Sequence, residues 1–491
     1  MMPTEMEARE ISRAEESRPL LARGPTVLLG ALMMTWPAFY NGFPLLYPDS
    51  MTYLGDGAVV ARKLFLHQSA NYYGMRSFFY SLGILPLHWN ATAWPVIAFQ
   101  AILTAYVLWL VVRSILPGRM VAAYLALIGA LSLLTSLSWY VSIVMPDITG
   151  PLLYLGFFLL VFAPESLSRP ERVMVGGIAC WAVTCHATHL ILATGLCGVL
   201  TGMMVVQRRP VQRIVRSAGE MAGILAVAAA AQLALYGYLY GTPSLNGERP
   251  PYLMARMVAD GTGKKYLEQH CGEERWALCN RLQNLAGDAD HFLWDADGGW
   301  GGASAEDQKE VRREEMPLVL ATIWAYPREQ FGKSAGAFWQ QLQAFGVEDL
   351  DPSSWVAEQF ETVLPRARGH YLASRQARNA LHVEGFTAFQ IWVVRSSLVL
   401  LIAFPPLVWR RVSSRLIGLS VVVTFVVFAN ALVTGTMSMV DERYGSRVIW
   451  MVPFLIGLFV LEWFSARGSS AERVNAEVAA GRIAQHQSFP G

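Results

Sequence analysis

The chain has 491 residues, of which 54% are hydrophobic and 15% are charged, and its formal net charge is +2. A water-soluble protein of this length carries roughly a quarter charged residues, so the composition excludes an ordinary soluble enzyme. The small net charge, without a basic block interleaved with aromatic residues, also gives no indication of a nucleic-acid partner.

Apolar runs divide the chain from the N-terminus onward. The first 24 residues are polar and lack the basic stub of a cleavable signal peptide, so the first run is predicted to be a retained span. Several runs exceed the roughly 17 residues needed to cross a bilayer core of about 30 Å. The runs cover residues 25–47, 93–112, 119–137, 140–163, 173–206, 217–240, 389–409, 416–434 and 448–464.

The run at 173–206 is too long for one ordinary crossing. Its 34 residues would form a helix about 51 Å long at a rise of 1.5 Å per residue. His186 and His189 lie in the middle of this run. It is therefore either one strongly tilted helix or two spans that turn at the histidines.

The arginine distribution decides between these alternatives. Eighteen arginines lie in the two tails and in four short segments, which are 113–119, 164–172, 207–216 and 410–415. The positive-inside rule assigns such segments to the cytoplasm, and only two spans within 173–206 place all four on one side. The sequence thus predicts ten spans with both ends cytoplasmic, although residues 173–185 are few for a full crossing and could instead form a re-entrant arm.

The predicted fold is an all-α integral membrane protein with about ten transmembrane helices. Apolar residues recur at near-helical spacing in the first external loop, which predicts interfacial helices there. A large external insert is polar, with 21 acidic and 15 basic residues, and its helix-like stretches near 306–345 and 353–382 predict a mostly helical cap. The expected regions are a cytoplasmic tail (1–24), a transmembrane core (25–240) with the first external loop (48–92), the insert (241–388), C-terminal spans (389–464) and a second cytoplasmic tail (465–491).

The five cysteines fall into two groups. Cys180, Cys185 and Cys197 lie in apolar runs and are predicted to be small core residues. Cys271 and Cys279 lie in the external insert, where an exported compartment would allow a disulfide between them. Two unpaired thiols are the alternative for this second group.

Two acidic residues lie where the chain meets the predicted external surface. Asp49 in LLYPDSMTYL follows the first span, and Asp147 in VMPDITG precedes another. An acid at a lipid boundary is costly to desolvate unless it is paired, which favours a function. Asp49 could act as a general base, and Asp147 could share its cavity, orient the substrate or help to bind a divalent metal. The alternative for both is a helix N-cap.

The motif HATH suggests a second polar feature on the same side. If it is helical, His186 and His189 share one face, which suits a metal pair or phosphate donors. A divalent ion such as Mg or Mn is the cofactor that these histidines and Asp147 would bind. Polar turn residues without any ligand are the alternative.

Arginines near the C-terminal spans are candidates for phosphate binding. Arg443 and Arg447 in DERYGSR lie one helical turn apart, with Tyr444 between them. Guanidinium groups bind phosphate oxygens through two parallel hydrogen bonds. Arg395, within or just above an apolar run, is a further candidate. Anchoring to lipid headgroups is the alternative for Arg443 and Arg447.

These features together resemble the GT-C superfamily. Its members are integral-membrane glycosyltransferases that use polyprenyl-phosphate sugars, and they include protein O-mannosyltransferases and aminoarabinose transferases. The resemblance covers about residues 25–240 and 389–464. It rests on an acid in the first external loop with interfacial helices behind it, a second acidic loop, and an Arg-Tyr element before a late span.

The resemblance implies roles for four residues. Asp49 matches the catalytic acid of the first loop, Asp147 matches the second acidic position, and Arg443 and Arg447 match groups that hold the lipid phosphate. The implied reaction is an inverting transfer from a lipid-linked sugar donor to a hydroxyl of a glycan, lipid or protein. It would take place at the external, periplasmic face of a bacterial inner membrane.

The chain also departs from these branches, which commonly carry their soluble part after the last span. Here a large insert interrupts the spans and the C-terminal tail is short, so the acceptor stays open. A transporter or flippase for a lipid-linked or anionic solute is one alternative, although no inverted repeat is evident. An acyltransferase acting on an external polysaccharide, with His186 or His189 as the base, is another.

Overall fold

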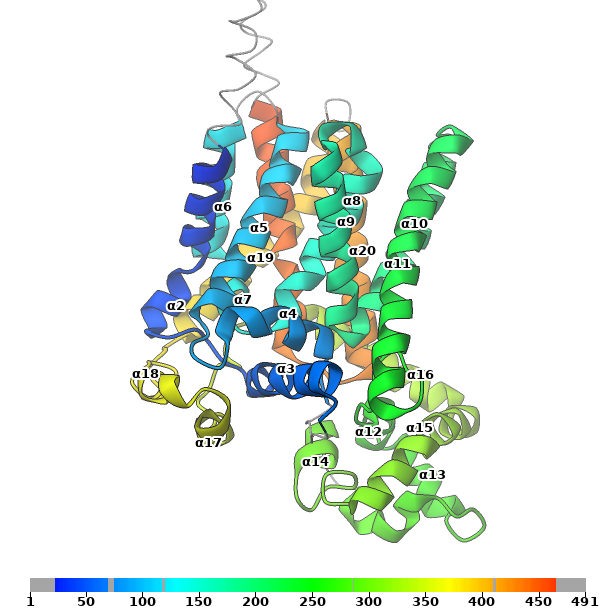
Figure 1. Ribbon diagram of the computed structural model, residues 1–491. Coiled ribbons are helices and arrows are strands. Elements are labelled where there is room, and N and C mark those ends of the chain that lie inside the picture. Colours follow the sequence, from blue (N-terminus) through cyan, green and yellow to red (C-terminus); the bar gives the residue numbers. More distant parts are fainter. Residues whose placement is uncertain (1–22, 69–74, 117–119, 286, 409–411, 465–491) are drawn as a thin grey trace, which may run out of the picture.

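The computed structural model describes residues 23–68, 75–116, 120–285, 287–408 and 412–464. Within these ranges the regular secondary structure is helical, and the one extended pairing is an isolated parallel bridge between Leu45 and Ile143. Long helices stand side by side as a bundle, and shorter helices gather at one end of it (Figure 1).

The first half of the chain supplies most of the bundle. It contains a helix over 23–34, α2 (Trp36–Asn41), α3 (Pro48–Leu66), α4 (Phe78–His88), α5 (Trp94–Ile115), α6 (Met120–Leu134), α7 (Leu137–Ser142), η2 (Pro146–Ile148), α8 (Thr149–Phe162), η3 (Pro164–Ser166), α9 (Arg169–Cys185), α10 (Ala187–Val206) and α11 (Val211–Tyr240). Figure 1 shows α3 lying across the lower end of the upright helices. The predicted helices of the first loop are thus α3 and α4.

The second half contains the insert and the C-terminal helices. The insert holds α12 (Tyr252–Ala259), α13 (Thr262–His270), η4 (Ala277–Asn284), α14 (Ala289–Trp294), α15 (Ala305–Ala325), α16 (Pro327–Gln343), α17 (Ser354–Val363), η5 (Pro365–Ala367) and α18 (Arg368–Leu372). The chain then forms α19 (Glu384–Val408), α20 (Ser414–Met437), α21 (Glu442–Ile449) and a helix over 451–464. The insert is mostly helical, as predicted.

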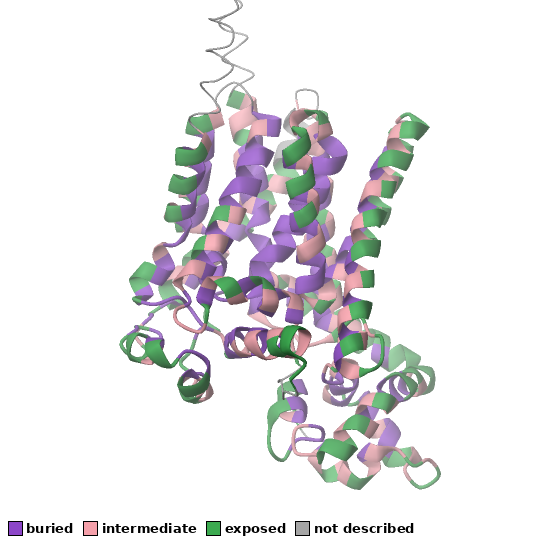
Figure 2. Ribbon diagram, viewed as in Figure 1, coloured by how far each residue is buried: buried purple, intermediate pink, exposed green. Residues whose placement is uncertain are grey.

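Six helical segments in the described part are long and apolar enough to cross a membrane. They are α5, α10, α11, residues Glu384–Ala403 of α19, α20 and the segment Glu442–Phe464. Large apolar side chains such as Val227 and Ile402 are exposed on the outside of this bundle (Figure 2). A water-soluble surface rarely exposes apolar residues in such number, so the protein has the make-up of an α-helical membrane protein.

The long apolar run at 173–206 forms two helices, α9 and α10, which are separated at His186. The start of α9 and the end of α10 lie at the same end of the bundle, because one cavity of about 180 Å³ is lined by Glu165, Met204 and Arg213. Arg213 also forms an ion pair with Glu165 at 2.7 Å. The two helices are therefore antiparallel, and the single tilted helix is excluded.

The arginine-rich segments meet at this same end. Glu171 at the start of α9 forms ion pairs with Arg23 at 2.9 Å and with Arg113 at 2.8 Å. Arg415 at the start of α20 donates to the backbone carbonyl of Ser114 at 2.7 Å. The segments predicted to share one side of the membrane therefore lie together, as far as the structure describes them.

The insert lies at the opposite end and has a core of its own. Met254, Leu267, Phe292 and Val311 belong to this core, which joins α12 to α15. The later part of the insert packs on the bundle, since α16 lies against α20 and α17 against α3. The insert thus has one part with a core of its own, which contacts the bundle through α12, and a second part that packs along the bundle.

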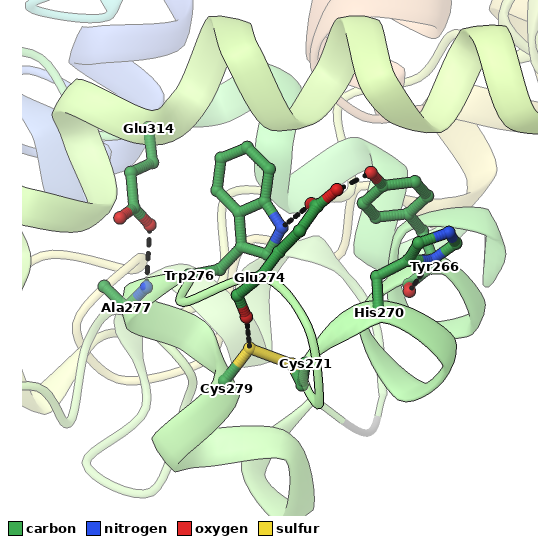
Figure 3. Close-up of a disulfide and its surroundings, with 8 residues drawn as sticks. All are labelled: Tyr266, His270, Cys271, Glu274, Trp276, Ala277, Cys279 and Glu314. Atoms are coloured by element: carbon green, nitrogen blue, oxygen red, sulfur yellow. Dashed lines mark hydrogen bonds between the residues drawn. A yellow bond between two sulfur atoms is a disulfide. The ribbon is translucent and has the colours of Figure 1, made fainter.

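A disulfide between Cys271 and Cys279 closes the loop that follows α13 (Figure 3). Within this loop the carboxylate of Glu274 accepts hydrogen bonds from the Trp276 indole at 2.6 Å and from the Tyr266 hydroxyl at 3.1 Å. A cross-link and partly buried hydrogen bonds restrict a segment that has little regular structure of its own. The second cysteine group is therefore a bonded pair, and Cys180, Cys185 and Cys197 are free.

Candidate functional site

The Leu45–Ile143 bridge fixes the two loops that carry the predicted acids. The backbone N–H of Leu45 donates to the carbonyl of Ser142 at 3.0 Å, and the N–H of Val144 donates to the carbonyl of Leu45 at 3.0 Å. The buried side-chain amide of Gln100 on α5 donates to the carbonyl of Ile143 at 2.8 Å. Buried backbone N–H and C=O groups need hydrogen-bond partners. These bonds supply them around Leu45 and Ile143, where the helical hydrogen bonds are interrupted.

Asp49 lies in the first turn of α3, four residues after Leu45. Tyr47 is the N-cap of this helix, and its N–H is satisfied by the hydroxyl of Ser50 at 2.9 Å. The carboxylate of Asp49 instead accepts hydrogen bonds from Arg76 at 2.5 Å and from Arg443 at 3.3 Å. The N-cap alternative for Asp49 is therefore excluded.

The two arginines determine the charge of Asp49. Burial favours the neutral acid, but the guanidinium groups of Arg76 and Arg443 outweigh it and hold the pKa of the Asp49 carboxyl below its usual range. Asp49 is consequently a carboxylate at neutral pH. Arg76 was not predicted from the sequence, where the one available signal is a lone arginine two residues before the apolar stretch FFYSLGIL.

A cavity of about 690 Å³ opens beside Asp49. It lies where α3, α10, α11, α20 and the insert meet, and its wall includes Asp49, Arg76, His186, Arg443 and Tyr444. Concave, partly apolar sites with a few convergent polar groups are the usual setting for ligand binding. The structure thus brings together residues from the first, middle and last thirds of the chain.

Arg443 and Arg447 differ in their relation to this cavity. Arg443 lines it, and its guanidinium lies over the rings of Tyr47 at 4.3 Å and Tyr444 at 5.0 Å. Arg447 is 1% exposed and donates to the side-chain carbonyl of Asn430 at 2.7 Å. Both arginines are buried, so anchoring to lipid headgroups does not describe them, and Arg447 lies behind the cavity wall.

Asp147 does not share the cavity of Asp49. Its carboxylate is buried in η2, and neither oxygen has a hydrogen-bond partner among the described residues. The Nη1 atom of Arg447 lies 3.7 Å from it, also without a hydrogen bond. Asp147 adjoins a much smaller pocket that Arg443 also lines. The expectation of one shared cavity is wrong. Asp49 lies on the cavity side of Arg443 and Arg447, and Asp147 lies on the other side of them.

The two histidine rings lie side by side, with their centroids 5.2 Å apart, although His186 precedes α10 and His189 lies in its first turn. Of the two, His186 lines the cavity. His189 is fully buried, and its Nδ1 atom bonds with the carbonyl of Ala182 at 2.7 Å. Its Nε2 atom lies close to Gly150, where a Cβ would come within 2.9 Å of it. His189 is therefore a packed residue of the helical core.

A metal site at Asp147 and the histidines is not formed among the described residues. The group of three potential ligands that the structure brings together is His291, Asp295 and Asp297, in the insert. Asp295 and Asp297 are exposed, and exposed acidic groups of this kind are common without an ion. The geometry near Asp49 therefore depends on arginines as its fixed positive charges.

Arg395 lies apart from the other candidates. It is exposed on α19 and is not among the residues that line the cavity. Its neighbours Trp392 and Val399 are exposed as well, so this face of α19 points away from the bundle. A long arginine side chain can extend along such an apolar face to reach polar surroundings. Arg395 therefore takes no part in the cavity that Asp49 and Arg443 line.

No family model, curated protein or solved structure matches the chain. The fold defines the class of protein, an α-helical membrane protein with a cavity of mixed polar and apolar lining at one end of its bundle. Any more particular function must be argued from the groups that line that cavity.

Proposed function

We propose that the protein is a membrane glycosyltransferase of the GT-C type. It transfers a sugar from a polyprenyl-phosphate donor to an acceptor hydroxyl, with inversion at the anomeric carbon. The observation that supports this most directly is the position of Asp49, a carboxylate held between Arg76 and Arg443 in one cavity at the end of a membrane bundle. A base and a pair of phosphate-binding groups are what this transfer requires.

The donor phosphate binds to the guanidinium groups of Arg443 and Arg76. Arg443 is preorganised for this, because two tyrosine rings and the backbone of α21 fix its position. Ile191 of α10 and Val433 and Met437 of α20 give the same cavity an apolar wall. That wall accommodates the first isoprene units of the lipid, which enter from the side of the bundle.

The reaction then needs one base and positive charge. The acceptor hydroxyl loses its proton to the Asp49 carboxylate while its oxygen bonds to the anomeric carbon. The bond between that carbon and the phosphate oxygen breaks, and polyprenyl phosphate leaves. Phosphate is a good leaving group, so no general acid is required. Arg443 and Arg76 stabilise the charge that develops on the leaving oxygen, which is typically the largest contribution to catalysis.

Donor binding also activates the base. Without a donor, Arg76 and Arg443 keep the pKa of Asp49 low, and a carboxylate with a low pKa is a weak base. A donor phosphate takes over part of the positive charge of both arginines. The pKa of Asp49 then rises toward a value that suits proton transfer, so deprotonation of the acceptor is favoured once the donor is in place.

We extend the proposal to the membrane topology. Ten helical segments cross the membrane, with the four shorter ones at 23–41, in α6, in Pro146–Phe162 and in α9. The arginine-rich end faces the cytoplasm, and the cavity faces the periplasm of a bacterial inner membrane. Ser304 and Gln207 are both exposed, but they lie at opposite ends of the molecule. A membrane-impermeant maleimide applied from outside should therefore label Ser304→Cys and not Gln207→Cys. The reverse pattern rules the topology out.

A direct assay tests the activity. The purified protein in nanodiscs is incubated with a panel of polyprenyl-phosphate sugars and a mixture of acceptors, and released polyprenyl phosphate is measured by mass spectrometry. Release by the native chain, and its loss in Asp49→Asn, is the expected result. Movement of intact donor between leaflets without cleavage would identify a flippase, and absence of release with every donor would refute the transferase.

A further inference from the structure

The insert contributes directly to the wall of the cavity. Figure 1 shows α14 beneath α3, and Asp290, Leu293 and Trp294 of α14 line the cavity beside Asp49. Tyr252 of α12 accepts a hydrogen bond from Arg76 at 2.5 Å. The insert therefore faces the same arginine that holds Asp49, although it has a separate hydrophobic core.

Trp294 is held in a fixed orientation with much of its surface open. Its indole N–H donates to the carboxylate of Asp290 at 3.1 Å, and the guanidinium of Arg76 lies 5.5 Å from the centre of its ring. The side chain is nevertheless 41% exposed, whereas Trp300 in the core of the insert is 4% exposed. An indole oriented by a hydrogen bond and a cation–π contact, and left uncovered, presents a rigid apolar surface to a ligand.

Further groups of the same kind lie around the cavity. Trp355 of α17 lines it, as do the carboxylates of Asp290 and Asp441. The carboxylate of Asp290 lies within electrostatic range of Asp441 and Arg443, so α14 faces the start of α21 across this space. Indole rings pack against the C–H faces of a sugar ring, and carboxylates accept hydrogen bonds from its hydroxyl groups.

We infer that α14 carries the acceptor subsite and that the acceptor is a neutral glycan, with Trp294 packed against one sugar ring and Asp290 bound to its hydroxyls. This inference rests on the proposed function, because it assigns a substrate to the same cavity. The insert carries 21 acidic and 15 basic residues, which disfavours a polyanionic chain. The glycan reaches Asp49 from the aqueous side, opposite to the lipid donor.

The test measures glycan binding without any donor. Full-length protein in nanodiscs is titrated with short neutral oligosaccharides, namely mannan, glucan, galactan and arabinan fragments, and with oligogalacturonate as an anionic probe; saturation-transfer NMR reports binding. We expect binding of at least one neutral fragment, weakened about tenfold or more by Trp294→Ala and by Asp290→Asn. Trp294→Phe should retain part of the affinity. Trp324→Ala, at an exposed site on α15 outside the cavity, should bind as the native protein does.

The outcomes separate this inference from the proposed function. Equal binding by Trp294→Ala and Trp324→Ala, preference for oligogalacturonate, or no binding of any neutral fragment would each overturn the acceptor subsite. Polyprenyl phosphate release from donors is scored in a separate experiment and decides the transferase on its own. If Trp294→Ala does not fold, Asp290→Asn and Trp294→Phe give the same comparison.

Discussion

Glu171 and Asp49 lie at opposite ends of the helical bundle, each between two arginines, but the two acids differ in what else they contact. Glu171 pairs with Arg23 and Arg113, and it also accepts the backbone N–H of Ser168 in a capping box at the start of α9. Asp49 pairs with Arg76 and Arg443, leaves the capping of α3 to Tyr47 and Ser50, and faces a large cavity. An acid between two arginines is thus fixed to the backbone at Glu171, whereas at Asp49 the same kind of ion pair is open to a cavity.

The largest expected effect comes from neutralising the two acids in turn. Asp49→Asn keeps the size of the side chain but cannot take up a proton, so turnover should fall by roughly 100-fold or more. Glu171→Gln should leave turnover within about twofold, because Glu171 lies at the other end of the bundle. The comparison fails if both variants lose activity equally, or if Asp49→Asn turns over at the native rate while folding normally.

The next effect separates the two arginines of α21. Arg443→Lys should lower kcat/KM about tenfold or more, because a lysine cannot reproduce the planar fork that binds phosphate. Arg447→Lys should act mainly on the free energy of unfolding, since Arg447 is buried against Asn430 and Asp147. Steady-state kinetics and urea unfolding of both variants check this. Normal kcat/KM in Arg443→Lys would remove Arg443 from the donor site.

A smaller effect should appear in the pH dependence. Asp49 must be ionised to act as a base, and Arg76 lowers the pKa of its carboxyl. Arg76→Gln removes one of the two positive charges, so the acidic limb of the kcat/KM profile should move to higher pH by about one unit. If the acidic limb does not move, even when the magnitude of kcat/KM changes, Asp49 is not the group that titrates.

The smallest effect on activity comes from the arginine-rich end. Arg113→Gln removes a hydrogen-bonded partner of the buried Glu171 and should lower the free energy of unfolding by about 1–3 kcal/mol. Turnover of the folded protein should not change. A loss of activity without a loss of stability would show that this end also takes part in the reaction.

Much of the helical organisation could be predicted because it depends on local patterns. Apolar runs and arginine-rich turns identified the break of 173–206 into two helices, and the insert was correctly expected to be mostly helical. Helix ends were less accurate. The first run was predicted to reach residue 47, but α2 ends at Asn41 because Gly42 adopts a left-handed conformation with φ of 84°.

The candidate site was only partly predictable, because its residues meet through tertiary contacts. Asp49, Arg443 and His186 reach the cavity as expected of polar residues near one end. Asp147, Arg447 and His189 have the same sequence character but lie behind its wall, and spacing along a helix cannot show which side a neighbour covers. Arg76 and Trp294 were missed because their importance comes from contacts with distant segments.

The bridge between Leu45 and Ile143 is a common fixed point from which both acidic loops begin. Asp49 and Asp147 each lie four residues beyond the bridged position. The residues that follow each bridged position are largely extended, so one added residue would shift the following side chains and change the direction in which they point. A single-residue insertion in either loop would therefore turn its carboxylate away from the arginines while leaving the bridge intact. Chain length between bridge and acid is consequently as tightly constrained as the identity of the acid itself.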